Sequence, residues 1–216
     1  MIMEKRKTNR NVFTEFTLLA AVVLMFAAGS ALGQSDNQRL SALRDIEQYS
    51  GEIRKYPDSP DAYVMRARAY VKVDRTAEAV DDLTKAIALS KHSYYVAQAT
   101  TDRGEVFYKL GEYTKAVADF TAVIELGSAA AYKPGAFLNR ARALIADGKT
   151  TEARNDANEA IKLYSAMKRR SAKKKLGEAY SLRAAINCMD GKRSEARADN
   201  VKAASLGAAS SKCGLK

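Results

Sequence analysis

Apolar and small residues follow a helical pattern in pairs of segments along the chain. In one such pair, Gly104 and Phe107 share one face of the first segment. Ala116 and Phe120 share one face of the second segment. Both halves keep the i, i+3, i+4, i+7 spacing of amphipathic helices. Gly111 lies between them, where a tight reversal of the chain favours glycine. The pattern therefore predicts two helices that fold back on each other as a hairpin.

The same hairpin pattern recurs four times along the sequence. An arginine in each first segment is followed sixteen residues later by an aspartate, and the four arginines lie 37, 37 and 43 residues apart. A fixed period of this size indicates a stacked array of repeats. A guanidinium facing a carboxylate across each hairpin would lock its two helices together. The expected structural pairs are Arg66 with Asp82, Arg103 with Asp119, Arg140 with Asp156, and Arg183 with Asp199.

The second unit resembles the consensus of the tetratricopeptide repeat family. The matching residues are Arg103-Gly104, Leu110-Gly111-Glu112-Tyr113, Lys115-Ala116-Val117 and Asp119-Phe120. The resemblance extends over residues 60–207. It implies an all-α fold, a right-handed α-α superhelix (solenoid) of about four helical hairpins plus an N-terminal capping helix. One departure is Asp74, which stands in the first turn where the other units have glycine.

The two ends of the array differ from its middle. A stripe of Leu40, Leu43, Ile46, Tyr49 and Ile53 predicts one amphipathic helix that covers the first hairpin. At the other end, polar Asn187 and Asn200 replace Phe107 and Phe120, which suits a last unit with no neighbour. The expected division is a capping helix at 34–58, repeats at 59–95, 96–132, 133–175 and 176–207, and a flexible tail at 208–216. The third repeat ends in an extended basic linker, and the fourth is the C-terminal cap.

The first 33 residues have the layout of a secretory signal peptide. Lys5, Arg6, Lys7 and Arg10 form a basic leader, and the apolar run that follows, 17–32, has 16 residues. That run is short against the roughly 20 residues that cross a bilayer. We expect cleavage after Gly33 and export to the periplasm or cell envelope of a bacterium. The alternative is an uncleaved segment that anchors the repeats in the membrane.

Charge and composition narrow the functional classes. The net charge is +11, and it falls to about +9 without the leader. Export argues against a nucleic-acid partner despite this charge. The only histidine, His92, has no second ligand at metal-binding spacing, and no phosphate loop or nucleophile motif occurs. We therefore expect no enzyme activity, no cofactor, no metal and no small-molecule substrate. Cys188 and Cys213 are exported together, so they either form a disulfide or remain two free thiols.

Two surfaces are candidates for binding. The family resemblance implies a concave groove lined by the first helix of each hairpin. The expected groove residues are Val64, Arg68, Lys72, Thr101, Glu105, Tyr108, Lys109, Leu138, Arg142 and Ile145. The second surface is a basic patch, which is either a solvated helix extension or a site for acidic partners. It comprises Lys168, Arg169, Arg170, Lys173, Lys174 and Lys175.

The sequence therefore favours a non-catalytic scaffold of the bacterial cell envelope. In this hypothesis the groove binds a partner protein or peptide with some acidic character. The alternative hypothesis uses the basic patch to dock the protein to an anionic membrane or cell-wall polymer.

Overall fold

The computed structural model describes residues 36–127 and 130–211, and this part of the chain contains helices and connecting turns without strands. The predicted signal peptide lies outside the described residues. An N-terminal helix covers residues 36–55. The helices that follow are α2 (Pro60–Lys72), α3 (Thr76–Leu89), α4 (Ser93–Lys109), α5 (Tyr113–Glu125), α6 (Lys133–Ala146), α7 (Thr150–Ser165), α8 (Arg170–Met189) and α9 (Arg193–Ser205).

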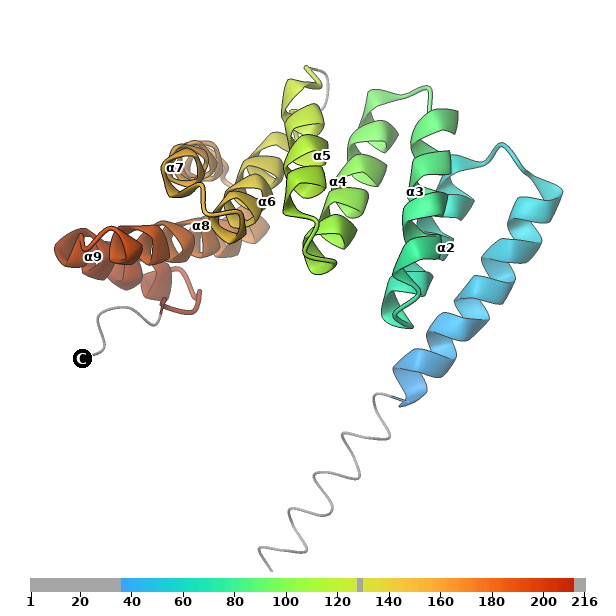
Figure 1. The fold of residues 1–216 in the computed structure, drawn as a ribbon, viewed down its shortest axis with the longest axis horizontal. Coiled ribbons are helices and arrows are strands. Elements are labelled where there is room, and N and C mark those ends of the chain that lie inside the picture. The colour runs from blue at the N-terminus through green and yellow to red at the C-terminus, as the bar shows by residue number, and fades with distance from the viewer. Residues whose placement is uncertain (1–35, 128–129, 212–216) are drawn as a thin grey trace, which may run out of the picture.

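These helices form four hairpins that stack in chain order (Figure 1). The hairpins are α2–α3, α4–α5, α6–α7 and α8–α9, and each second helix also packs on the first helix of the next hairpin. The first helices touch one another in sequence, whereas the second helices of the described hairpins do not. The array therefore curves with the first helices on its inner side. The predicted all-α superhelix of repeated hairpins is confirmed.

The N-terminal helix packs against α2. Ile46 joins the core of the first hairpin, and Ser50 accepts a hydrogen bond from Arg66 Nη1 at 3.1 Å. Asp45 lies 3.7 Å from Lys72 Nζ. Of the predicted apolar stripe, Leu40 and Leu43 are about half exposed although Ala42 between them is fully buried, so the start of the stripe is only partly covered.

The turn inside each hairpin has the same backbone form although its residues differ. Gly111 has φ +76°, and Glu112 N donates to Phe107 O at 2.9 Å. Asp74 occupies the matching place in the first hairpin with φ +61°. Aspartate tolerates this left-handed region better than most non-glycine residues, because its short polar side chain can bond locally. The departure at Asp74 therefore leaves the hairpin geometry intact.

The described segment after α9, residues 206–211, folds back over the last hairpin. A Cβ on Gly177 would lie 2.8 Å from the Cβ of Ala208, so the segment after α9 lies directly against α8. Ser211 N donates to Asn200 Oδ1 at 2.8 Å. The described part of the predicted flexible tail, 208–211, is thus held in place. The reason is that Asn200, expected to belong to a last unit with no neighbour, binds this segment.

No helix within the described ranges is both long enough and apolar enough to span a bilayer.

Candidate functional site

The inner face of the array carries two small pockets between successive first helices. One, of about 160 Å³, lies between α2 and α4 and is lined by Arg68, Val71, Asp102, Glu105 and Lys109, with Ala67, Leu83 and Val106. The other, of about 260 Å³, lies between α4 and α6 and is lined by Glu105, Tyr108, Lys109, Asn139 and Arg142, with Phe120. Glu105 and Lys109 line both. We call this surface the inner groove.

A series of side-chain hydrogen bonds joins neighbouring first helices across the inner groove. Arg68 Nε donates to Asp102 Oδ2 at 2.7 Å, which ties α2 to α4. Asn139 Nδ2 donates to Glu105 Oε1 at 3.0 Å, which ties α6 to α4. These contacts hold the first helices in register, because each joins two neighbouring hairpins.

The third set of these contacts joins α6 to α8. Arg142 Nη2 donates to Glu178 Oε2 at 2.9 Å, and Lys175 Nζ donates to the same oxygen at 3.0 Å. Burial acts to raise the pKa of Glu178, but the hydrogen bonds from Lys175 and Arg142 outweigh it and lower that pKa. Glu178 is therefore a carboxylate at neutral pH, and it holds Arg142 in place.

Two predicted groove residues do not line the groove. Val64 and Leu138 are only 6% and 1% exposed. Val64 belongs to the same core cluster as Ala99 of α4, and Leu138 to the same cluster as Ala179 of α8. The first helix of the next hairpin covers this position. The assignment of Val64 and Leu138 to a binding surface is therefore wrong.

The remaining predicted groove residues divide into two groups. Thr101 is half-buried and donates its hydroxyl to Ala97 O at 2.7 Å, and Ile145 packs beside the core of the third hairpin. Lys72 points toward the N-terminal helix. The structure brings the other five together around the two pockets: Arg68, Glu105, Tyr108, Lys109 and Arg142. Among these, Lys109 makes no ion pair with any described residue.

Each repeat arginine forms a bidentate pair with its aspartate. For example, Arg140 Nε and Nη2 donate to the two Asp156 oxygens at 2.7 and 2.8 Å. The hydrogen bond to Asp156 raises the pKa of Arg140, although burial opposes it. Arg66–Asp82, Arg103–Asp119 and Arg183–Asp199 have the same geometry, with distances between 2.7 and 2.9 Å. These arginines are engaged inside the hairpins and do not face the groove pockets.

Each of these arginines also makes a third contact, which the sequence analysis missed. Arg140 Nη1 donates to Thr121 Oγ1 at 2.9 Å, so the guanidinium also reaches the preceding hairpin. Arg103 does the same to Thr84, Arg183 to Asn158 and Arg66 to Ser50. Thr84, Thr121 and Asn158 recur every 37 residues, a regularity that could have indicated the contact. Ser50 takes this role on the N-terminal helix, which therefore stands where a preceding second helix would stand.

The basic patch lies at the connection from α7 to α8. All six of its residues are exposed. Lys175 is paired with Glu178, whereas the other five make no ion pair within the described residues. A pocket of about 500 Å³ lies beside them, lined by Lys168, Arg169 and Lys175 together with Ala130, Ala131, Tyr164, Met167, Ser171 and Ala172. The patch is separate from the pockets of the inner groove.

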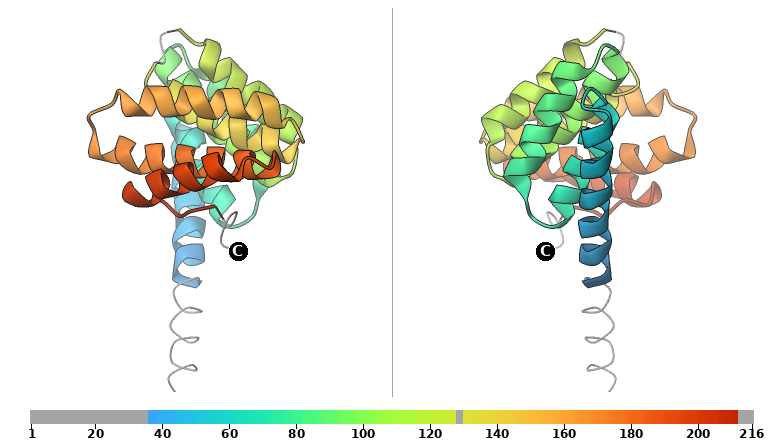
Figure 2. Two further views of the ribbon diagram at one scale, coloured as in Figure 1. Left: turned by 90° about the vertical axis from the view of Figure 1, so that its left-hand side faces the viewer. Right: turned by 90° about the vertical axis from the view of Figure 1, so that its right-hand side faces the viewer.

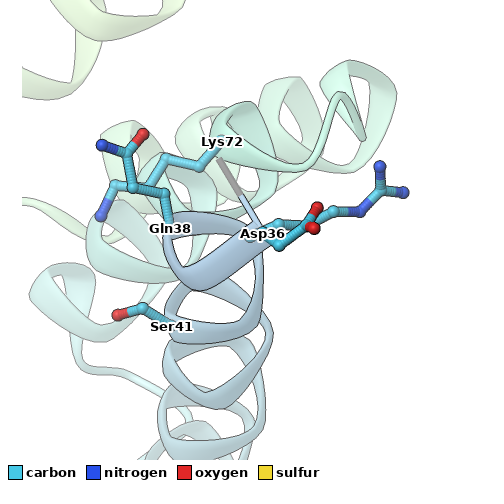
Figure 3. A pocket seen from close by; sticks show the side chains of 5 residues that line it. Asp36, Gln38, Ser41 and Lys72 are labelled. Atoms are coloured by element: carbon cyan, nitrogen blue, oxygen red, sulfur yellow. The ribbon is translucent and has the colours of Figure 1, made fainter. Parts of the chain in front are cut away.

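Other features do not form a site. A cavity of about 640 Å³ is lined by Asp36, Gln38, Arg39, Ser41 and Lys72 (Figure 3), but it borders residues before 36 that the structure does not describe. Within the described residues, no group of His, Cys, Asp or Glu side chains could hold a metal ion. Whether Cys188 and Cys213 form a disulfide or remain two thiols involves Cys213, which lies outside the described residues.

Comparisons with known proteins agree with this architecture. A family model described as tetratricopeptide repeat matches residues 64–131 and again 101–168. No curated protein matches the sequence.

Several solved structures share the fold at low sequence identity. MamA is 17% identical, with 75% of this chain and 86% of that chain covered, at a TM-score of 0.62. PilF of Pseudomonas aeruginosa is 15% identical, with coverage of 80% and 78%, at a TM-score of 0.63. BtubC of P. vanneervenii is 12% identical, with coverage of 80% and 73%, at a TM-score of 0.65. At such identities the similarity concerns the fold alone.

The repeat period, the stacked hairpins and the family model agree on one classification. The family model therefore identifies residues 64–168 of this array as tetratricopeptide repeats.

Proposed function

We propose that this chain is a non-catalytic scaffold that binds a partner protein or peptide in the inner groove. Tetratricopeptide repeat proteins generally mediate protein–protein interactions. The observation that supports a groove site here is the pair of pockets on α4, which share Glu105 and Lys109. Pockets repeated between successive first helices suit an extended or helical peptide that places side chains at regular intervals.

The charges of the groove indicate what such a peptide would carry. Arg68 and Arg142 already bond to carboxylates of this chain, so they position the groove more than they attract a ligand. Lys109 has no such partner among the described residues and is exposed. Tyr108 beside it is 38% exposed and supplies an aromatic surface. We infer a peptide with an acidic side chain near Lys109 and an apolar one against Tyr108.

The proposed location is the cell envelope of a bacterium. The support is in the sequence, where the basic leader and the short apolar run 17–32 precede the repeats. If that segment stays uncleaved, it would anchor the repeats at the membrane surface.

Removing the proposed contacts should weaken binding of the partner. The full chain would be used to capture proteins from an envelope extract, in parallel with a Tyr108→Ala, Lys109→Glu double variant. We expect the double variant to bind the captured partner at least about tenfold more weakly, because it loses an aromatic anchor and reverses a charge. Affinity would then be measured by calorimetry with the purified partner.

A matched control is Lys85→Glu, which reverses an exposed charge on α3 outside both pockets. It should bind the partner as the wild type does. Equal loss of binding in Lys85→Glu, or full binding by the double variant with a wild-type circular dichroism spectrum, would show that the inner groove is not the binding site.

A further inference from the structure

The connection from α7 to α8 combines features that the proposed groove function does not use. The segment 166–177 contains six basic residues and no acidic one. It projects beyond the ends of the neighbouring hairpins (Figure 2). Five of the six cations make no ion pair with described residues, and the sixth, Lys175, is paired with Glu178. Unpaired cations gathered on a projecting turn attract an anionic surface.

The start of α8 adds to this positive charge. Arg169 occupies the N-cap position without a side-chain cap, and the first turn contains no acidic residue. The N-terminal end of a helix already carries a partial positive charge and free N–H groups. Cations placed there are unfavourable for the isolated helix, and an anion bound beside them would relieve that repulsion.

The adjoining pocket is lined by a tyrosine whose hydroxyl group has no hydrogen-bond partner among the described residues. Tyr164 is only 9% exposed, lines this pocket, and its hydroxyl makes no hydrogen bond to a described residue. Burial raises the pKa of Tyr164 to about 12, so the hydroxyl stays a neutral donor at physiological pH. The hydroxyl can therefore donate to an acceptor on a ligand in this pocket.

The remaining walls of the pocket are apolar. Met167 is 37% exposed, and Ala130 and Ala131 are exposed beside it. Free phosphate or a hydrated acidic polymer would make no use of such walls. An amphiphile would use both parts, because its charged group would meet Lys168 and Arg169 while its apolar part covered Met167.

We propose that the α7–α8 connection is a docking site for the surface of a membrane that contains anionic phospholipids. In this site Lys168, Arg169, Arg170, Lys173 and Lys174 contact the headgroups, a phosphate oxygen accepts the Tyr164 hydroxyl, and Met167 enters the acyl boundary. The pocket of this site shares no lining residue with the pockets of the inner groove, so a scaffold whose groove holds a protein partner would be held at a membrane by a different surface.

Vesicle co-sedimentation tests this site. The full chain and its variants would be mixed with phosphatidylcholine vesicles, with or without phosphatidylglycerol, at near-physiological salt. A Lys168→Ala, Arg169→Ala, Lys173→Ala variant should bind the anionic vesicles about 100-fold more weakly, at roughly fivefold for each cation near the surface. Met167→Ser and Tyr164→Phe should each weaken binding by roughly tenfold, through lost burial and a lost hydrogen bond to a charged acceptor.

The matched control is Lys85→Ala, Lys91→Ala, Lys202→Ala, which removes three exposed charges elsewhere. All variants keep the same N-terminal leader, so differences between them report the α7–α8 site. Equal weakening in the two triple variants would overturn the proposal, because net charge alone would then explain the binding. So would unchanged binding of Met167→Ser and Tyr164→Phe, or displacement from vesicles by inorganic phosphate or an acidic peptide at lower concentrations than by soluble phosphatidylglycerol.

Discussion

Replacing Asp156 with alanine should lower the free energy of unfolding by about 3 kcal/mol. The Asp156 side chain is 7% exposed and that of Arg140 is 20% exposed. Without the carboxylate, Arg140 would keep only its bond to Thr121 Oγ1 at 2.9 Å. Breaking a fully buried pair costs about 3–5 kcal/mol. The partial exposure of Arg140 places the expected loss at the lower end, and urea denaturation followed by circular dichroism would measure it.

Two further variants test whether the loss of stability comes from the uncompensated charge of Arg140. Glu159→Ala removes an acidic residue from the same helix, but its pair with Lys162 is exposed, so it should change stability by at most about 0.5 kcal/mol. Replacing Arg140 and Asp156 together with leucine should recover most of the loss, because no uncompensated charge remains. If Asp156→Ala costs no more than Glu159→Ala, these pairs do not lock the hairpins.

The contacts within a hairpin could be predicted from the sequence, because a short offset determines them. Sixteen residues across one turn place Arg140 opposite Asp156 whatever the rest of the array does. The bond from Arg140 to Thr121 depends instead on how one hairpin stacks on the last. It follows from the sequence only when recurrent positions in neighbouring units are compared. The sequence therefore predicts the structure of a single hairpin more directly than the way in which successive hairpins stack.

The distinction between contacts within a hairpin and contacts between hairpins also explains why two of the predicted groove residues were wrong. In the repeat pattern of a single hairpin, Val64 and Leu138 lie off the positions that pack within that hairpin, which is why the sequence predicts them to be open. The first helix of the next hairpin covers both. The helical pattern correctly leaves Arg68, Glu105 and Lys109 outside the core. That they line two pockets depends on how the side chains of α2, α4 and α6 meet. Helical periodicity does not contain that information.

In the second hairpin the sizes of two facing residues, Gly104 and Phe120, are matched. Phe120 is 1% exposed, and a Cβ on Gly104 would lie 2.8 Å from its ring. The residues that match Gly104 in the other units are Ala67, Ala141 and Ala184, and those that match Phe120 are Leu83, Ala157 and Asn200. Glycine occurs only opposite the largest partner. The ring, and not the helix backbone, therefore requires glycine at 104.

Phe120→Ala should lower the free energy of unfolding by about 3–5 kcal/mol, because it leaves a cavity in the core. Gly104→Ala in the wild type should cost about 1–3 kcal/mol through overlap with the ring. In the Phe120→Ala background the same substitution should cost nothing or add up to about 1 kcal/mol of stability, because alanine favours a helix and the ring is absent. A double-mutant cycle by urea denaturation measures this coupling. Equal costs of Gly104→Ala in the two backgrounds would show that the ring does not select glycine, because the penalty would then arise elsewhere, for example at the Cβ of Asp119, which a Cβ on Gly104 would meet at 3.2 Å.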